Sequence, residues 1–104
     1  MLGLFYELND PQAVSEFLAA HSHLFAPLLA AHKELHKYFG QEVSACLELV
    51  TDPDSSALQQ LTVWIRSSDV PEVAVEKRRQ FASDWWLQQP YAVRRYLSFV
   101  VESK

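Results

Sequence analysis

Two segments of alternating apolar and polar residues, 43–51 and 61–66, constrain the fold of this chain more than any other feature. Alternation with period two is typical of a strand that buries one face. The expected buried set is Val43, Ala45, Leu47, Leu49, Leu61, Val63 and Ile65. Residues 51–56 between the two segments are turn formers without an apolar residue. The pattern therefore predicts an antiparallel hairpin with Thr62, Trp64 and Arg66 on its outward face.

A helix is expected directly after the hairpin and would cover it, because an isolated hairpin is only marginally stable in water. Asp69 and Glu72 have the spacing of a capping box, and Pro71 fits the first turn. The helix is predicted to run to Leu87 and then to stop at Pro90. Its expected buried stripe is Val70, Ala74, Phe81 and Trp85.

Residues 94–102 fit two interpretations. The alternation of Arg95, Leu97, Phe99 and Val101 indicates a strand, whereas a helical stripe through Val93, Tyr96, Leu97 and Val100 also fits. The density of aromatic and β-branched residues favours the strand. A strand that follows the hairpin through a helix would join it by a right-handed crossover.

The N-terminal part is predicted to be helical. Residues 1–8 either pair with a sheet edge or cover the core. Asp10 and Pro11 form a helix start, and Pro27 ends or kinks the helix that follows. A second helical stretch runs from Leu28 to Phe39 and stops at Gly40. This part is either a pair of helices or one bent helix.

Together these segments predict one α+β domain over residues 1–104. The N-terminal helical unit is followed by ββαβ, which gives a small, mostly antiparallel three-stranded sheet with helices on one face. With 104 residues the chain has room for a single core.

The composition limits the compartment and the partners. The net charge is −4, which disfavours nucleic acid unless the cations cluster. Cys46 is the single cysteine, so the chain has no internal disulfide and a reducing compartment is the simplest setting. The N-terminus lacks the features of a signal peptide, and no apolar run is long enough to span a bilayer. We expect a cytoplasmic protein that does not enter a membrane.

Three stretches of the chain stand out together, namely Leu47-Glu48-Leu49-Val50-Thr51-Asp52-Pro53-Asp54, Leu61-Thr62-Val63-Trp64-Ile65 and Phe81-Ala82-Ser83-Asp84-Trp85-Trp86-Leu87. In these stretches the chain resembles a family of small uncharacterised bacterial proteins. The family shows a strand ending in an Asp-Pro turn, a second strand, and a helix that closes on Trp-Trp-Leu. This chain departs from it at Ala82, where an acidic residue is usual, and at Arg94-Arg95-Tyr96, which replaces a Gly-Lys lead-in. The resemblance implies the fold and implies no catalytic residue.

Histidines offer the alternative of a small metal- or ligand-binding protein. His32 and His36 stand four residues apart on a predicted helix, so both rings could reach one divalent ion, with Glu16 or Glu34 as an added ligand. No signature spacing supplies the remaining ligands, and a plain helix surface is the competing interpretation. We expect no bound cofactor.

Cys46 could pair with a histidine as a nucleophile and base, but it lies mid-strand beside Glu48, which would raise the pKa of its thiol. A small residue packed under a helix is the expected role. No enzymatic activity is predicted.

Nucleic-acid binding is a third, less favoured interpretation of the sequence. Lys77-Arg78-Arg79 and Arg94-Arg95 are interleaved with aromatic residues, as in nucleic-acid surfaces. The helical positions scatter these cations, and neighbouring carboxylates would pair with several of them.

The aromatic residues point to binding of another protein. Trp85 and Trp86 differ by about 100° around a helix, so both cannot sit centrally in its buried stripe. The competing interpretation is that the two N-terminal helices bury all of the tryptophans. Large exposed aromatic and arginine side chains are enriched at protein interfaces. The candidate partner-binding residues are Trp64, Arg66, Trp85, Trp86 and Tyr96. We expect a non-enzymatic interaction or regulatory module, self-associating as a homodimer through the sheet edge or the tryptophan helix. Asp52, Asp54 and Glu102 would suit a basic partner.

Overall fold

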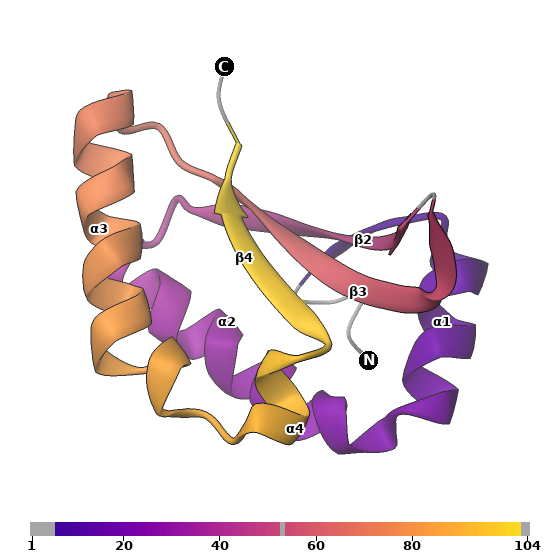
Figure 1. The fold of residues 1–104 in the computed structure, drawn as a ribbon. Helices are drawn as coiled ribbons and strands as arrows, with labels where there is room; N and C mark the ends of the chain where they lie inside the picture. Colours follow the sequence, from indigo (N-terminus) through magenta and orange to yellow (C-terminus); the bar gives the residue numbers. More distant parts are fainter. Residues whose placement is uncertain (1–5, 53, 103–104) are drawn as a thin grey trace.

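The computed structural model describes residues 6–52 and 54–102, and for residues 52 and 55–58 it describes the main chain only. These residues form four strands, four α-helices and two short 3₁₀ helices, and Figure 1 shows the helices gathered on one face of the sheet. In chain order the elements are β1 (Glu7–Asn9), α1 (Pro11–Ala20), η2 (Ser22–Leu24), α2 (Phe25–Phe39), β2 (Ser44–Asp52), β3 (Ser55–Arg66), α3 (Pro71–Asp84), η3 (Trp86–Gln88), α4 (Tyr91–Arg94) and β4 (Leu97–Val101).

The fold is α+β, as predicted, and β2 and β3 form the predicted antiparallel hairpin. The expected mostly antiparallel three-stranded sheet is wrong, because the sheet is mixed and four-stranded in the order β1-β2-β3-β4. β1 joins β2 in parallel and β4 joins β3 in parallel. Both parallel pairs arise because helices lie between the paired strands and carry the chain back across the sheet. β1 has three residues, too few to show a period of two in the sequence.

The core lies between the sheet and the helix layer. The strand register stacks Leu47 beside Val63 and Phe99 in one row, and Leu49 beside Leu61 and Leu97 in another. Buried helix residues meet these rows, namely Val14, Phe17, Leu18, Leu28, Ala31, Leu35, Phe39, Ala74 and Phe81. The apolar alternation therefore faces the helices, as expected, and the opposite face of the sheet carries polar residues together with a few apolar ones.

The N-terminal helices start and stop close to the predicted residues. The Asp10 side chain accepts a hydrogen bond from the Ala13 main-chain N–H, and Pro11 opens α1. The 3₁₀ turn η2 separates α1 from α2, so this part is a pair of helices. α2 begins at Phe25 rather than Leu28, because Pro27 falls in its first turn, where no main-chain donor is needed. Gly40 ends α2 with a positive φ of 96°.

α3 differs from its prediction at both ends. Its N-cap residue is Val70, which is 59% exposed rather than buried, and the expected capping box is absent. Asp69 instead accepts hydrogen bonds from Lys77 Nζ at 2.8 Å and from the Ser67 hydroxyl at 2.9 Å. The helix ends at Asp84 instead of Leu87, and a 3₁₀ turn follows.

Residues 94–102 contain the favoured strand. β4 occupies Leu97–Val101, with the short helix α4 directly before it. At the other end of the chain, Tyr6 is buried and its hydroxyl donates to the Leu28 main-chain oxygen at 2.7 Å. Residues 1–5, part of the segment expected to pair or to cover the core, lie outside the described residues. Within the described part of the chain, no helix has both the length and the apolar character to cross a bilayer.

Candidate functional site

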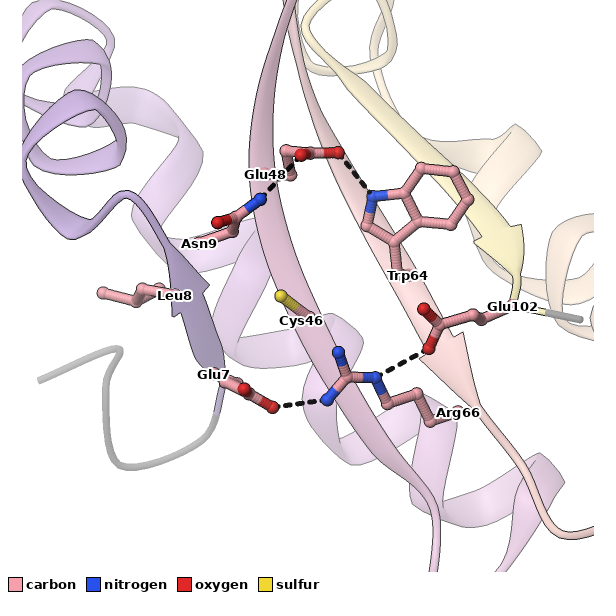
Figure 2. A pocket seen from close by; sticks show the side chains of 8 residues that line it. All are labelled: Glu7, Leu8, Asn9, Cys46, Glu48, Trp64, Arg66 and Glu102. Atoms are coloured by element: carbon pink, nitrogen blue, oxygen red, sulfur yellow. Dashed lines mark hydrogen bonds and ion pairs between the residues drawn. The ribbon is translucent and has the colours of Figure 1, made fainter. Parts of the chain in front are cut away.

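The face of the sheet opposite the helices carries a group of polar side chains from three neighbouring strands. We call it the helix-free face and define it by the outward residues of the strands: Glu7, Asn9, Ser44, Cys46, Glu48, Val50, Gln60, Thr62, Trp64, Arg66, Ser98 and Val100. A hollow of about 460 Å³ lies over β1, β2 and β3 on this face. It is lined by Glu7, Leu8, Asn9, Cys46, Glu48, Trp64, Arg66 and Glu102 (Figure 2).

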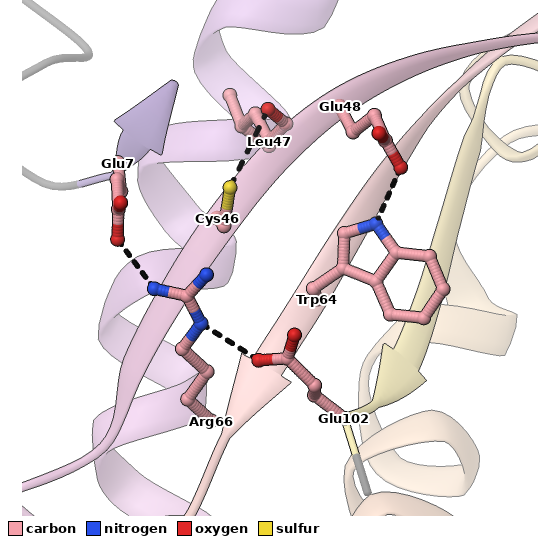
Figure 3. A network of polar contacts seen from close by, with 7 residues as sticks. All are labelled: Glu7, Cys46, Leu47, Glu48, Trp64, Arg66 and Glu102. Carbon is pink, nitrogen blue, oxygen red and sulfur yellow. Dashed lines mark hydrogen bonds and ion pairs between the residues drawn. The ribbon is translucent and has the colours of Figure 1, made fainter. Parts of the chain in front are cut away.

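Arg66 holds one end of the hollow together. Its Nε donates to Glu102 Oε2 at 2.7 Å, and its Nη1 pairs with Glu7 Oε2 (Figure 3). The hydrogen bonds from Arg66 to Glu102 and to Glu7 raise the pKa of the guanidinium above its ordinary value. All three side chains are partly exposed, so solvent screening keeps their contribution to stability small. Their main effect is to tie β1, β3 and the residue after β4 to one another.

Glu48 sits at the other end of the hollow between two neutral donors. Asn9 Nδ2 donates to its Oε2 at 2.6 Å, and Trp64 Nε1 donates to its Oε1 at 3.0 Å. Both bonds follow from the strand register, because Asn9 stands beside Glu48 while Trp64 lies diagonally across on β3. Among the described residues, Glu48 forms no ion pair. Its carboxylate is therefore fixed in position and keeps its negative charge uncompensated.

The charges of the hollow sum to a negative value. Three carboxylates, from Glu7, Glu48 and Glu102, face one guanidinium, from Arg66, which leaves two formal negative charges. The indole of Trp64 adds an aromatic surface beside the Glu48 carboxylate (Figure 2). A negative hollow with an indole at its side attracts cations through both the charge and the quadrupole of the ring.

Cys46 lies at the base of the hollow. It was expected to pack under a helix, but its position in β2 places it on the helix-free face, where neighbouring side chains leave it 6% exposed. Burial is the main cause that raises the pKa of its thiol, and the nearby Arg66 charge opposes this rise. A raised pKa keeps the thiol protonated near neutral pH and makes it a poor nucleophile.

The five candidate partner-binding residues do not form one surface. Trp64 and Arg66 lie together in the hollow. Trp86 is 8% exposed and packs on Phe99 with ring centroids 4.7 Å apart, so it belongs to the core. Trp85 is partly buried against the same core. Of the three indoles of the chain, the hollow therefore contains that of Trp64.

Tyr96 lies in a separate cluster at the end of the sheet beside η2. Its ring centroid is 4.3 Å from that of His21 and 5.8 Å from that of His23. The guanidinium of Arg95 stands over the Tyr96 ring at 4.8 Å. This cluster is distinct from the hollow and contains one of the expected partner-binding residues.

His32 and His36 lie side by side on α2, with ring centroids 4.5 Å apart. Burial, followed by the charge of His36, lowers the pKa of His32. Within the described residues, no three side chains of the metal-binding types come close enough to share an ion. The pair thus lacks, in this part of the chain, the third protein ligand that zinc sites use.

The basic residues expected near the aromatic rings are dispersed by local contacts. Lys77 pairs with Asp69, and Arg79 pairs with Glu76. Arg78 Nε donates to the Phe99 main-chain oxygen at 2.7 Å, and Arg94 Nε donates to that of Gln89 at 2.9 Å. Few of these cations are left for contacts with phosphates.

Comparisons with known proteins add no family to this description. No family model matches the chain, and neither a curated protein nor a solved structure matches it. The resemblance to a family of small bacterial proteins therefore stays a prediction.

Proposed function

We propose that this chain is a non-enzymatic protein-interaction module that binds a basic surface of another protein with its helix-free face. The observation that carries the proposal is the hollow, which three carboxylates, one guanidinium and an indole line on a sheet face that no described element covers. Complementary charge between two surfaces selects partners and speeds their encounter. The net charge of −4 of the whole chain acts in the same direction.

Apolar area on the same face supports binding of a protein rather than of a small ion alone. Val50 is among the exposed large apolar side chains, and Val100 is half-buried beside Trp64. Protein interfaces combine such an apolar and aromatic centre with polar side chains around it. The hollow with its neighbours has this composition.

The charge of the hollow argues for an unlike partner over a second copy placed face to face. Two copies related by a twofold axis would bring the same acidic groups against each other, and the like charges would repel. The homodimer expected from the sequence stays a separate prediction, which size-exclusion chromatography with light scattering tests.

The proposal is tested by capture from extracts of the native host with matched baits. Trp64→Ala and Glu48→Gln change the hollow, while Leu87→Ala removes an exposed side chain, 57% accessible, from η3 in the helix layer. We expect one captured protein with a basic surface that the wild-type chain and Leu87→Ala retain and that both hollow variants lose. A partner that binds all four baits equally, or one that only Leu87→Ala loses, would contradict the proposal.

A further inference from the structure

The hydrogen bonds and the charge of the Glu48 carboxylate indicate which group of a partner the hollow binds. Each oxygen of its carboxylate accepts one hydrogen bond, from Asn9 and from Trp64. A carboxylate offers about four lone-pair positions, so about half remain open for further donors. Both donors are neutral, and they hold the carboxylate in place without cancelling its charge.

The other charges in the hollow do not oppose an incoming cation. Arg66 is the cation in this hollow, and it is paired with both Glu7 and Glu102. These three side chains together carry one net negative charge. The summed charge of the hollow around a cation bound beside Glu48 therefore stays negative.

We infer that the hollow binds an arginine side chain of the partner, with the guanidinium against the Glu48 carboxylate and over the Trp64 indole. This inference rests on the proposed function and names the group that the helix-free face recognises. A guanidinium is planar, donates several parallel hydrogen bonds to a carboxylate, and stacks on aromatic rings. The adjacent carboxylate and indole match both properties, whereas a lysine ammonium uses only the charge. Glu48 and Trp64 thus determine the specificity of the face.

The test follows the indole N–H signal of Trp64 by ¹H–¹⁵N NMR during titration with defined peptides. The signal is assigned as the one that disappears in Trp64→Phe. The probe is acetyl-Gly-Gly-Arg-Gly-Gly-amide, and its neutral counterpart carries citrulline in place of arginine. We expect the arginine peptide to shift the Trp64 signal saturably, with an apparent Kd of about 1–10 mM. The signals of Trp85 and Trp86 stay in place, and the citrulline peptide causes no saturable shift.

Matched variants show whether the Glu48 carboxylate is responsible. Glu48→Gln should raise the apparent Kd at least about tenfold, because a charge-assisted hydrogen bond is lost. Glu76→Gln removes the same charge from an exposed position on α3 and should change the Kd less than about twofold. Where Glu48→Gln fails to fold, the citrulline comparison on the wild-type chain still decides the question.

Three results would overturn the inference: no saturable shift with the arginine peptide, equal binding of the citrulline peptide, or a lysine peptide that binds as tightly as the arginine peptide. Its failure is distinguishable from failure of the proposed function. If capture depends on Trp64 while the peptide arms fail, the helix-free face binds a partner by another group. If capture does not depend on Trp64, the proposed function itself is contradicted.

Discussion

At the scale of single residues, the three tryptophans have three different environments. Trp86 is buried against Phe99, Trp85 is partly buried beside it, and Trp64 lies in the hollow with its N–H bonded to Glu48. The first two pack on the core, and the third is the one to which the proposed function assigns the contact with a partner. This division gives a direct experimental contrast.

Replacement of Trp86 and, separately, of Trp64 should distinguish an effect on folding from an effect on binding. Trp86→Ala removes a core ring and should lower the free energy of unfolding by about 3–5 kcal/mol. Trp64→Phe keeps an aromatic ring on a half-buried site and should lower it by less than about 1 kcal/mol, while it weakens binding of the partner. Urea denaturation followed by circular dichroism measures both values. Equal destabilisation by the two variants would show that Trp64 also has a structural role.

Tyr6 should make the stability sensitive to alkaline pH. Burial raises the pKa of its hydroxyl above the ordinary value of 10.0, so the folded chain keeps this proton at a pH where the unfolded chain loses it. The stability is therefore unaffected below pH 10.0 and falls as the pH rises above it. Tyr6→Phe removes the titration and costs about 1 kcal/mol through the lost hydrogen bond to Leu28.

Urea midpoints of the wild type and of Tyr6→Phe, measured at about pH 8 and about pH 11, test this account. We expect the wild type to be the more stable at the lower pH and to lose more stability than the variant at the higher pH. If the urea midpoints of the wild type and of Tyr6→Phe fall by the same amount between the two pH values, Tyr6 does not contribute to the pH dependence.

At the scale of elements, local backbone geometry determines where helix α2 ends. Gly40 ends α2 with φ 96° and ψ 178°, a region that residues with a Cβ rarely adopt. A Cβ built at this position meets no atom within 4 Å, so the cost of a substitution comes from the backbone alone. Gly40→Ala should lower the free energy of unfolding by about 1–3 kcal/mol. Gln41→Ala, at the exposed neighbour, should change it by less than about 0.5 kcal/mol, and a larger change there would contradict this view.

The outer strand β4 is protected by α3. The Tyr96 carbonyl and the Glu102 main-chain N–H form hydrogen bonds with β3. Because the main-chain groups of successive residues in a strand point to opposite edges, the Phe99 carbonyl points away from β3. Arg78 Nε donates a hydrogen bond to this carbonyl at 2.7 Å. Unpaired strand edges promote association between copies. Arg78→Ala should therefore increase self-association at high protein concentration, as measured by light scattering. Arg79→Ala is the control, since Arg79 pairs with Glu76 on the exposed side of α3. Unchanged mass for both variants would contradict a protective role of Arg78.

The elements that could be predicted are those with a repeated pattern. The alternation in residues 43–51 indicated β2, and that in residues 61–66 indicated the second half of β3, which begins at Ser55 within the stretch expected to be a turn. The apolar residues from Leu97 indicated β4. β1 could not be predicted as a strand because Glu7, Leu8 and Asn9 are too few to show a period. Pro71 opens α3 as expected, but the predicted cap by Asp69 was wrong because Asp69 bonds to Lys77 eight residues later, a contact that local spacing does not reveal.

The candidate site was only partly predictable for the same reason. Trp64 and Arg66 were expected on the outward face, and they lie in the hollow. Glu48 alternates with the expected buried residues Leu47 and Leu49, which places it on the outward face, but its bond to Trp64 could have been inferred only with the register of the hairpin. Glu7 and Asn9 could not be assigned to the hollow without β1. Trp86 was expected at an interface because the sequence does not show that the helix ends at Asp84, after which η3 turns this ring into the core.

At the scale of the whole molecule, the charge is distributed in a way that suits binding of a basic partner. The chain carries a net charge of −4, and the hollow contributes two of these negative charges. Attraction over long distances speeds association and is screened by salt. The association rate with the captured partner should therefore fall about tenfold or more between about 50 and 500 mM salt, whereas the dissociation rate should change much less. Stopped-flow fluorescence measures both rates. An association rate that does not depend on salt would contradict electrostatic steering.

We propose that the helix-free face contacts the partner and that the helix layer does not. Site-specific photo-crosslinking in the native host tests it most directly, with benzoylphenylalanine placed either at Val50 on the helix-free face or at Leu87 on η3, both exposed. We predict a crosslinked adduct with one basic protein from position 50 and none from position 87. An adduct formed only from position 87 would contradict the account.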